Sequence, residues 1–144
     1  MSAIAVTTAV LLFGVGLLHA LWTVTAWPWN TRLDLARATM GWAHDTPPGR
    51  WFLPACLGVT ALLAAAGCVL LLRADVVHAA VPAWTVTSAS WAVAVILLAR
   101  GVSGLLDPTD RSPNAPAVYR RLNQRAYSPF CLVLGGLAAV VAAS

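Results

Sequence analysis

Long apolar runs, separated by shorter polar or proline-containing stretches, make up most of the chain. The longer runs have roughly the 20 residues that an α-helix needs to cross about 30 Å of hydrocarbon. The pattern predicts an all-α fold, a four-transmembrane-helix antiparallel bundle in which residues 1–144 form a single integral membrane domain. The expected transmembrane helices cover about residues 3–26, 51–72, 78–99 and 128–143.

The first apolar run has a second interpretation. Val24 and Ala26 would fit the small residues of a signal-peptide cleavage site. The run has no basic segment at its start, however, and it is long for the hydrophobic region of a signal peptide. We therefore favour a retained transmembrane helix.

The two long connections contain segments that are expected to lie on the membrane surface as short helices. The first is residues 30–43, where Asn30 is the expected N-cap. The second is residues 116–125, which carry several arginines. Ser128 and Pro129 have the residue types of a helix start, so the fourth transmembrane helix is expected to begin there.

Composition narrows the class of protein. The residues are 60% hydrophobic and 10% charged, with a mean hydropathy of +0.78, which excludes a water-soluble domain of this size. The net charge of +4 comes from arginines in a chain without a soluble basic domain or an aromatic RNA-binding motif. Anionic membrane lipids are therefore the expected partner, and nucleic acid is not.

The arginines also predict an orientation. Only Arg73 lies in the short connection between the second and third apolar runs, and the remaining arginines lie toward the two long loops. The positive-inside rule then places the long loops in the cytoplasm and both termini outside. The abundance of Ala, Val and Leu is typical of GC-rich bacterial genomes, so we expect a multi-pass protein of the bacterial plasma membrane.

The cysteines do not indicate a metal site or a disulfide scaffold. Cys56, Cys68 and Cys131 lie inside apolar runs and lack CxxC spacing, and we expect neither a metal nor another cofactor. Cys56 and Cys131 share a depth in the membrane. Two buried, inert thiols are the favoured interpretation, and a redox pair is the alternative.

His19 is the one ionisable residue deep inside a predicted transmembrane helix. Trp22 and Thr23 follow at i+3 and i+4 and so share its face. Polar groups at that depth usually face the interior of a helix bundle. His19 is therefore a candidate acid, base or hydrogen-bond donor in a cavity that opens toward the long loops. A neutral histidine bonded to a threonine or a backbone carbonyl is the alternative.

A polar and aromatic stripe marks the third apolar run. Trp84, Thr87, Ser88 and Trp91 follow helical spacing, and the stripe is expected to face the same interior as His19. Thr87 and Trp91 are then candidate ligand contacts. Packing between helices is the favoured explanation of the stripe, and Trp84 would serve as an interfacial anchor.

The run from residue 100 to residue 127 holds seven of the 14 charged residues of the chain. Arg100 is expected at the mouth of the cavity, where it would bind a phosphate or carboxylate, or pair with Asp107 or Asp110. Asp107 is also a candidate catalytic residue. Tyr127 is a candidate ligand contact or an interfacial anchor. A snorkelling arginine at a helix end is the alternative for Arg100.

Three segments, LLHALW, LLARGVSG and RAYSPFCLVLGG, together resemble a family of small bacterial four-helix membrane proteins, domain of unknown function 3995. Two positions differ from the family pattern, because Gly104 and Asn123 stand where the resemblance implies acidic residues. The resemblance implies a fold but no activity. The positions that match it are His19, Trp22, Arg100, Arg125, Tyr127, Ser128, Pro129 and Cys131.

Two functional hypotheses follow. In the first, an intramembrane pocket binds a lipid-like or isoprenoid ligand, and His19 isomerises or cyclises it while Arg100 and Asp107 close the mouth. In the second, the protein is a non-catalytic membrane subunit or scaffold. It would then bind a larger membrane protein, or a second copy of itself, through small residues such as Gly16 and Ala20.

Overall fold

The computed structural model describes residues 1–106 and 114–144, and within these residues it contains helices and no strand. The predicted all-α class is therefore confirmed. In chain order the elements are α1 (Ser2–Leu21), α2 (Arg32–Met40), α3 (Phe52–Arg73), α4 (Ala83–Leu106), α5 (Ala117–Leu122), the π-helix η1 (Asn123–Tyr127) and α6 (Ser128–Ala142).

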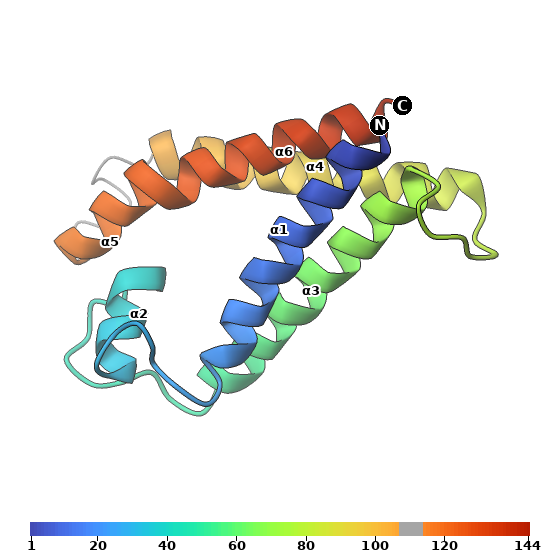
Figure 1. Cartoon of the computed structure of the whole chain (residues 1–144). Helices are drawn as coiled ribbons and strands as arrows, with labels where there is room; N and C mark the ends of the chain where they lie inside the picture. Colours follow the sequence, from blue (N-terminus) through green and yellow to red (C-terminus); the bar gives the residue numbers. More distant parts are fainter. Residues whose placement is uncertain (107–113) are drawn as a thin grey trace.

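The long helices form two antiparallel pairs, α1 with α3 and α4 with α6 (Figure 1). The pairs meet at the end of the molecule where both chain termini lie, and they diverge toward the long loops. Four helical stretches of the described chain are long and apolar enough to cross a membrane: α1, α3, α4 and the stretch Ala117–Ala142. The chain is thus a multi-pass membrane protein.

Small residues allow α1 and α3 to pack closely against each other. A Cβ atom on Gly67 of α3 would lie 2.5 Å from the Phe13 ring of α1, so the ring would have to move to admit any larger residue. The Thr60 hydroxyl lies 3.0 Å from the carbonyl oxygen of Gly16 and 2.9 Å from that of Cys56, so its one proton is shared between an interhelical and an intrahelical acceptor. Close approach of this kind is how helices associate in a membrane, where apolar surface alone gives little preference for a protein neighbour. The hydrophobic core lies where the two helix pairs meet and consists of Ala5, Leu12, Leu70, Ala94, Leu134, Ala138 and Val141.

The helix α2 bridges the two pairs at the long-loop end. Its buried Leu35 belongs to a second apolar cluster with Trp22, Phe52 and Cys56 of the α1–α3 pair. Its last turn ends at Gly41, which has a left-handed φ of +68° and lies against the Tyr119 ring of α5. The two pairs are therefore connected through α2 even where they diverge.

Two features of α2 and α4 differ from the sequence prediction. The N-cap of α2 is Thr31 and not Asn30, because the Thr31 side chain accepts the backbone N–H of Asp34 at 3.1 Å. The helix α4 begins at Ala83 and continues to Leu106, so Arg100 lies inside this helix and not at its end.

The helix α6 begins at Ser128, as predicted, but no break separates it from the helices before it. Residues Ala117–Ala142 form one helical stretch, and the backbone of Ser128 is helical, with φ −69° and ψ −47°. The backbone N–H of Ser128 bonds to Asn123 O, five residues earlier, which is the pattern of a π-helix. This wider turn immediately precedes Pro129, whose missing N–H and bulky ring disfavour a regular α-helical turn at that point. The expected surface segment is therefore continuous with the fourth apolar helix.

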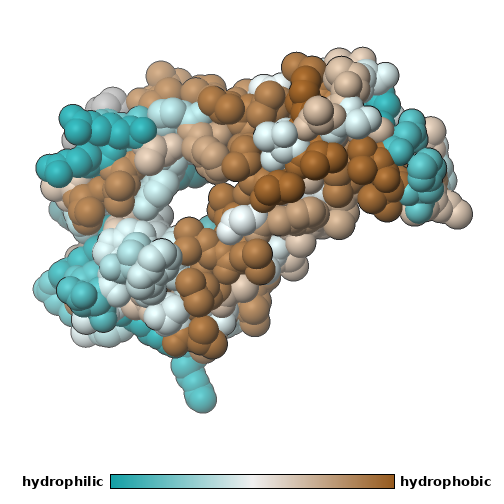
Figure 2. Space-filling view, in the orientation of Figure 1, coloured by the Kyte–Doolittle hydropathy of each residue, from teal (hydrophilic) through white to brown (hydrophobic). Residues whose placement is uncertain are grey.

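Figure 2 shows apolar surface along the helices and polar surface toward the long loops and the short α3–α4 connection. The same view shows the molecule hollowed between the α4–α6 arm and the lobe that contains α2. That hollow lies where the two helix pairs diverge.

Candidate ligand cavity between the helix pairs

A cavity of about 340 Å³ lies between the diverging helix pairs. Its volume is within the range of about 300–1,000 Å³ that is typical of small-molecule sites. Its walls come from α1, α2, α4, η1 and α6, so segments far apart in the sequence meet there. The lining residues are Val15, Leu18, His19, Trp22, Thr39, Arg100, Tyr127, Phe130 and Cys131.

His19 lies near the end of α1, where its Nδ1 atom is 2.8 Å from the carbonyl oxygen of Val15. A carbonyl oxygen only accepts hydrogen bonds, so Nδ1 carries the proton in this contact. In a neutral ring Nε2 is then the unprotonated nitrogen, which is able to accept a hydrogen bond or a proton. The backbone bond thus fixes the tautomer and orients the ring.

Trp22 forms a rigid wall beside His19. Its side chain is buried, and its indole N–H donates a hydrogen bond of 3.0 Å to the carbonyl oxygen of Trp27. The His19 and Trp22 ring centroids are 4.7 Å apart, and the Trp22 and Trp29 ring centroids are 5.9 Å apart. Thr23, in contrast, donates its hydroxyl to Ala20 O at 2.7 Å and does not line the cavity.

Arg100 reaches the cavity from α4 and is held by a buried polar cluster. Its Nη2 atom donates to Asn123 Oδ1 at 2.9 Å, and Ser128 Oγ donates to the same oxygen at 3.2 Å. The Nδ2 atom of Asn123 donates to Gly104 O at 2.9 Å. The bonds to Arg100 and Gly104 connect Asn123 to α4, and the bond from Ser128 lies within the continuous helix that contains η1. We name Arg100, Gly104, Asn123 and Ser128 the Asn123 cluster.

The sequence prediction missed the role of Asn123, which appeared there only as a departure from a family pattern. An uncharged residue inside a predicted surface segment gave no signal of burial. The clue was positional, because Asn123 lies within the same LNQRAYSP run as Tyr127 and Ser128. Its 5% exposure shows that the run faces protein and not solvent at this position.

Tyr127 closes the cavity toward the long loops. Its hydroxyl lies 3.3 Å from the carbonyl oxygen of Ala38 in α2, to which it donates. The bond connects the two helix pairs across the hollow. Tyr127 therefore lies at the cavity, as predicted for a ligand contact, and also holds α2 in place.

A second hollow of about 220 Å³ shares His19, Trp22 and Thr39 with the first and extends along α3. It adds Met40, Phe52, Ala55, Cys56 and Val59 to the lining. His19 consequently lies between the two hollows. Cys56 lines the second hollow and Cys131 the first, and both are free thiols.

The aromatic stripe of α4 does not face this cavity, so that prediction is wrong. Trp91 is 44% exposed and Trp84 is 73% exposed, while the face that packs inward carries the small residues Ser90, Ala94, Gly101 and Gly104. In a membrane, large aromatic side chains are able to face lipid while small residues bring helices together.

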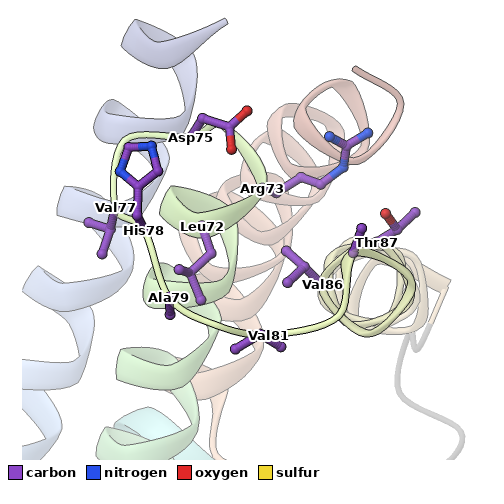
Figure 3. Close-up of a pocket in the computed structure, with 10 residues that line it drawn as sticks. Leu72, Arg73, Asp75, Val77, His78, Ala79, Val81, Val86 and Thr87 are labelled. Carbon is purple, nitrogen blue, oxygen red and sulfur yellow. The ribbon is translucent and has the colours of Figure 1, made fainter.

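Thr87 lies at the opposite end of the protein. It lines a separate hollow of about 280 Å³ around the α3–α4 connection, together with Arg73, Asp75 and His78 (Figure 3). Arg73 extends away from this hollow and donates to Ala142 O at 3.3 Å, which connects the ends of α3 and α6. Thr87 is therefore not part of the His19 cavity.

The remaining candidate, Asp107, lies outside the described residues, as does Asp110. Within residues 1–106 and 114–144 no group of three or more histidine, cysteine or acidic residues is arranged to hold a metal ion. The cavity thus brings together four of the eight residues predicted for the site: His19, Trp22, Arg100 and Tyr127.

The fold and the cavity define a class: a small multi-pass helical membrane protein with a largely apolar hollow between two helix pairs. A family model described as a protein of unknown function (DUF3995) matches residues 12–138. The chain belongs to this family, as the resemblance in its sequence indicated, and the match includes every residue that lines the cavity. No curated protein and no solved structure matches the chain.

Proposed function

We propose that the protein binds a lipid-like or isoprenoid ligand in the cavity between its helix pairs and isomerises or cyclises it with His19 as the acid–base group. The observation that carries this proposal is the position of His19. It lies between two connected apolar hollows, with its tautomer fixed by Val15 O. The protein would act in a bacterial plasma membrane, with its long loops in the cytoplasm.

One histidine is sufficient for such a reaction. Its Nε2 atom would take a proton from an activated carbon of the ligand and return it to another carbon, so that the ligand gains and loses one proton. A positioned acid–base group contributes about 10²- to 10⁴-fold to a rate. The Trp22 ring beside it would stabilise the positive charge that His19 carries once it has taken the proton.

The alternative of a non-catalytic subunit was expected to use the helix face that contains Gly16. That glycine is buried, and a Cβ atom on it would lie 3.5 Å from Thr60 O and 3.6 Å from Leu63 Cβ. The α1–α3 contact thus already occupies this face. A protein partner would have to bind elsewhere. For this reason we favour the ligand-binding function over the subunit function.

The proposal is tested by comparing the ligands that purify with wild-type protein and with His19→Ala. Mass spectrometry of each detergent-purified sample should find a stoichiometric isoprenoid or lipid. The variant should retain the unconverted molecule, and added wild-type protein should convert that molecule. His78→Ala, a histidine in the α3–α4 connection, is the matched control and should behave as wild type.

Two results would contradict the proposal. If the wild type carries only bulk phospholipid together with a stable protein partner, the cavity is not a specific ligand site. If wild type and His19→Ala carry the same molecule and neither converts it, the protein binds a ligand without catalysis.

A further inference from the structure

We propose that the ligand has an anionic head group, a phosphate or carboxylate, that Arg100 binds, and that Asn123 is the positioning residue that aims the guanidinium at it. This inference rests on the proposed function of the cavity as a ligand site. It adds the chemical class of the ligand, an anionic amphiphile with its charge at the α4 wall and its apolar part along α1.

The surroundings of Arg100 motivate an anion. Arg100 lies inside the transmembrane helix α4 and lines a cavity whose other walls include Val15, Leu18 and Phe130. A charged side chain at such a position is costly and usually indicates a functional site. Arginine presents several N–H donors in a planar fork that fits phosphate and carboxylate oxygens.

The contact with Asn123 orients Arg100 without neutralising it. Asn123 Oδ1 accepts one N–H from Arg100, and it is a neutral acceptor that leaves the positive charge in place. Asn123 itself is fixed at both ends of its amide, because Oδ1 also accepts from Ser128 and Nδ2 donates to Gly104 O. The cluster therefore holds the guanidinium in one position and leaves its charge to attract an anion.

An amide at position 123 satisfies this network better than a carboxylate would. Its Nδ2 atom lies 2.9 Å from Gly104 O, where a carboxylate oxygen would face a carbonyl oxygen and repel it. The network also requires a glycine at position 104. A Cβ atom there would lie 2.5 Å from Arg100 Nη1 and would also clash with Ser128 Oγ. Both positions thus preserve the space and the charge of Arg100.

The cavity gives the ligand its apolar part. The lining of the cavity beyond Arg100 and Tyr127 is mainly aliphatic and aromatic, and the adjoining hollow along α3 continues past His19 to Phe52 and Val59. An amphiphile held at Arg100 would extend its chain along His19. This arrangement would place a carbon atom, and not the head group, beside Nε2.

The test uses the intact protein in nanodiscs of neutral phosphatidylcholine and measures binding by calorimetry. Three probes separate the parts of the proposal: dodecyl phosphate, dodecanol and inorganic phosphate. Dodecyl phosphate should bind about 10- to 100-fold more tightly than dodecanol, the factor that one or two charge-assisted hydrogen bonds give. Inorganic phosphate should neither bind measurably nor compete.

Variants then show which residues are responsible for the tighter binding of dodecyl phosphate. Arg100→Gln should reduce the affinity for dodecyl phosphate to that for dodecanol, and Asn123→Asp should do the same because its carboxylate neutralises the guanidinium. The affinity for dodecanol should stay unchanged in both, which also reports that each variant is folded. Arg125→Gln, an exposed arginine of the same helical stretch, is the matched control and should leave all affinities unchanged.

Three outcomes would overturn the inference. Equal binding of dodecyl phosphate and dodecanol would mean that the ligand is neutral, although the ligand cavity itself would stand. Competition by inorganic phosphate alone would indicate a site for a free anion. If no probe binds, the cavity proposal fails as well.

Discussion

Gly135 of α6 is one of the glycines that allow this helix to approach α4 closely. A Cβ atom on Gly135 would lie 2.8 Å from Leu98 Cγ and 2.9 Å from the Leu98 backbone nitrogen. Ordinary van der Waals contact begins at 3.4 Å, so the Cγ contact is about 0.6 Å too short. A change of rotamer would relieve the contact with the leucine side chain, but not the contact with its backbone nitrogen. Gly135→Ala must therefore push the two helices apart or rotate one of them.

The neighbouring Gly136 provides a control for the magnitude. A Cβ atom on Gly136 meets nothing within 4 Å. Replacing either glycine by alanine stabilises the helix itself by about 0.5–1 kcal/mol, and this gain is common to both variants. The difference between them is then the cost of overpacking, about 1–3 kcal/mol. Gly135→Ala should be the less stable variant by that amount.

The assay is the free energy of unfolding in mixed detergent micelles, followed by circular dichroism under identical conditions for both variants. Gly136→Ala should match or exceed the wild type, and Gly135→Ala should fall below it. If the two alanine variants are equally stable, the close contact between α4 and α6 at Leu98 is incorrect. A lower stability of Gly136→Ala alone would reverse the assignment of the inward face of α6.

Two further substitutions test the other helix contacts. Thr60→Val should lower the free energy of unfolding by about 0.6–1 kcal/mol, because it removes the interhelical hydrogen bond to Gly16 O while conserving shape, and the same unfolding assay measures it. An unchanged stability would mean that this bond contributes nothing. Gly41→Ala should loosen α2 by about 1–2 kcal/mol, because φ is +68° there and the Tyr119 ring lies 3.0 Å from the added Cβ atom. Faster hydrogen exchange in α2, with Gly49→Ala as the unaffected control, would confirm this, whereas unchanged exchange would refute it.

The apolar runs were sufficient to predict the helical class and the approximate positions of the transmembrane helices, because the length of a bilayer-spanning helix is set by the bilayer. They were also sufficient to predict that His19, Arg100 and Tyr127 lie near one another. Depth in the membrane follows from counting residues along a helix, and the three residues lie near the same side. Burial of Trp22 beside His19 followed from i+3 spacing.

Rotation of a transmembrane helix about its axis could not be predicted in the same way. Trp91 and Thr87 looked like an inward stripe, yet the inward face of α4 carries Ala94 and Gly101. In water, the apolar face of a helix identifies the core. In lipid both faces are apolar, so the discriminating signal is residue size, which the periodicity of polar and aromatic positions does not report.

The continuity of the last helix could not be predicted either, and it is what makes the cavity. Asn123 and Tyr127 are four residues apart and would share one face of a regular α-helix. The two side chains nevertheless reach different helices, because Asn123 bonds to Gly104 of α4 while Tyr127 bonds to Ala38 of α2. One helical stretch therefore both orients Arg100 and connects the diverging pairs. A break in the chain before Ser128 would leave neither contact in place, so the continuity of this stretch connects the position of Arg100 to the loop side of the cavity.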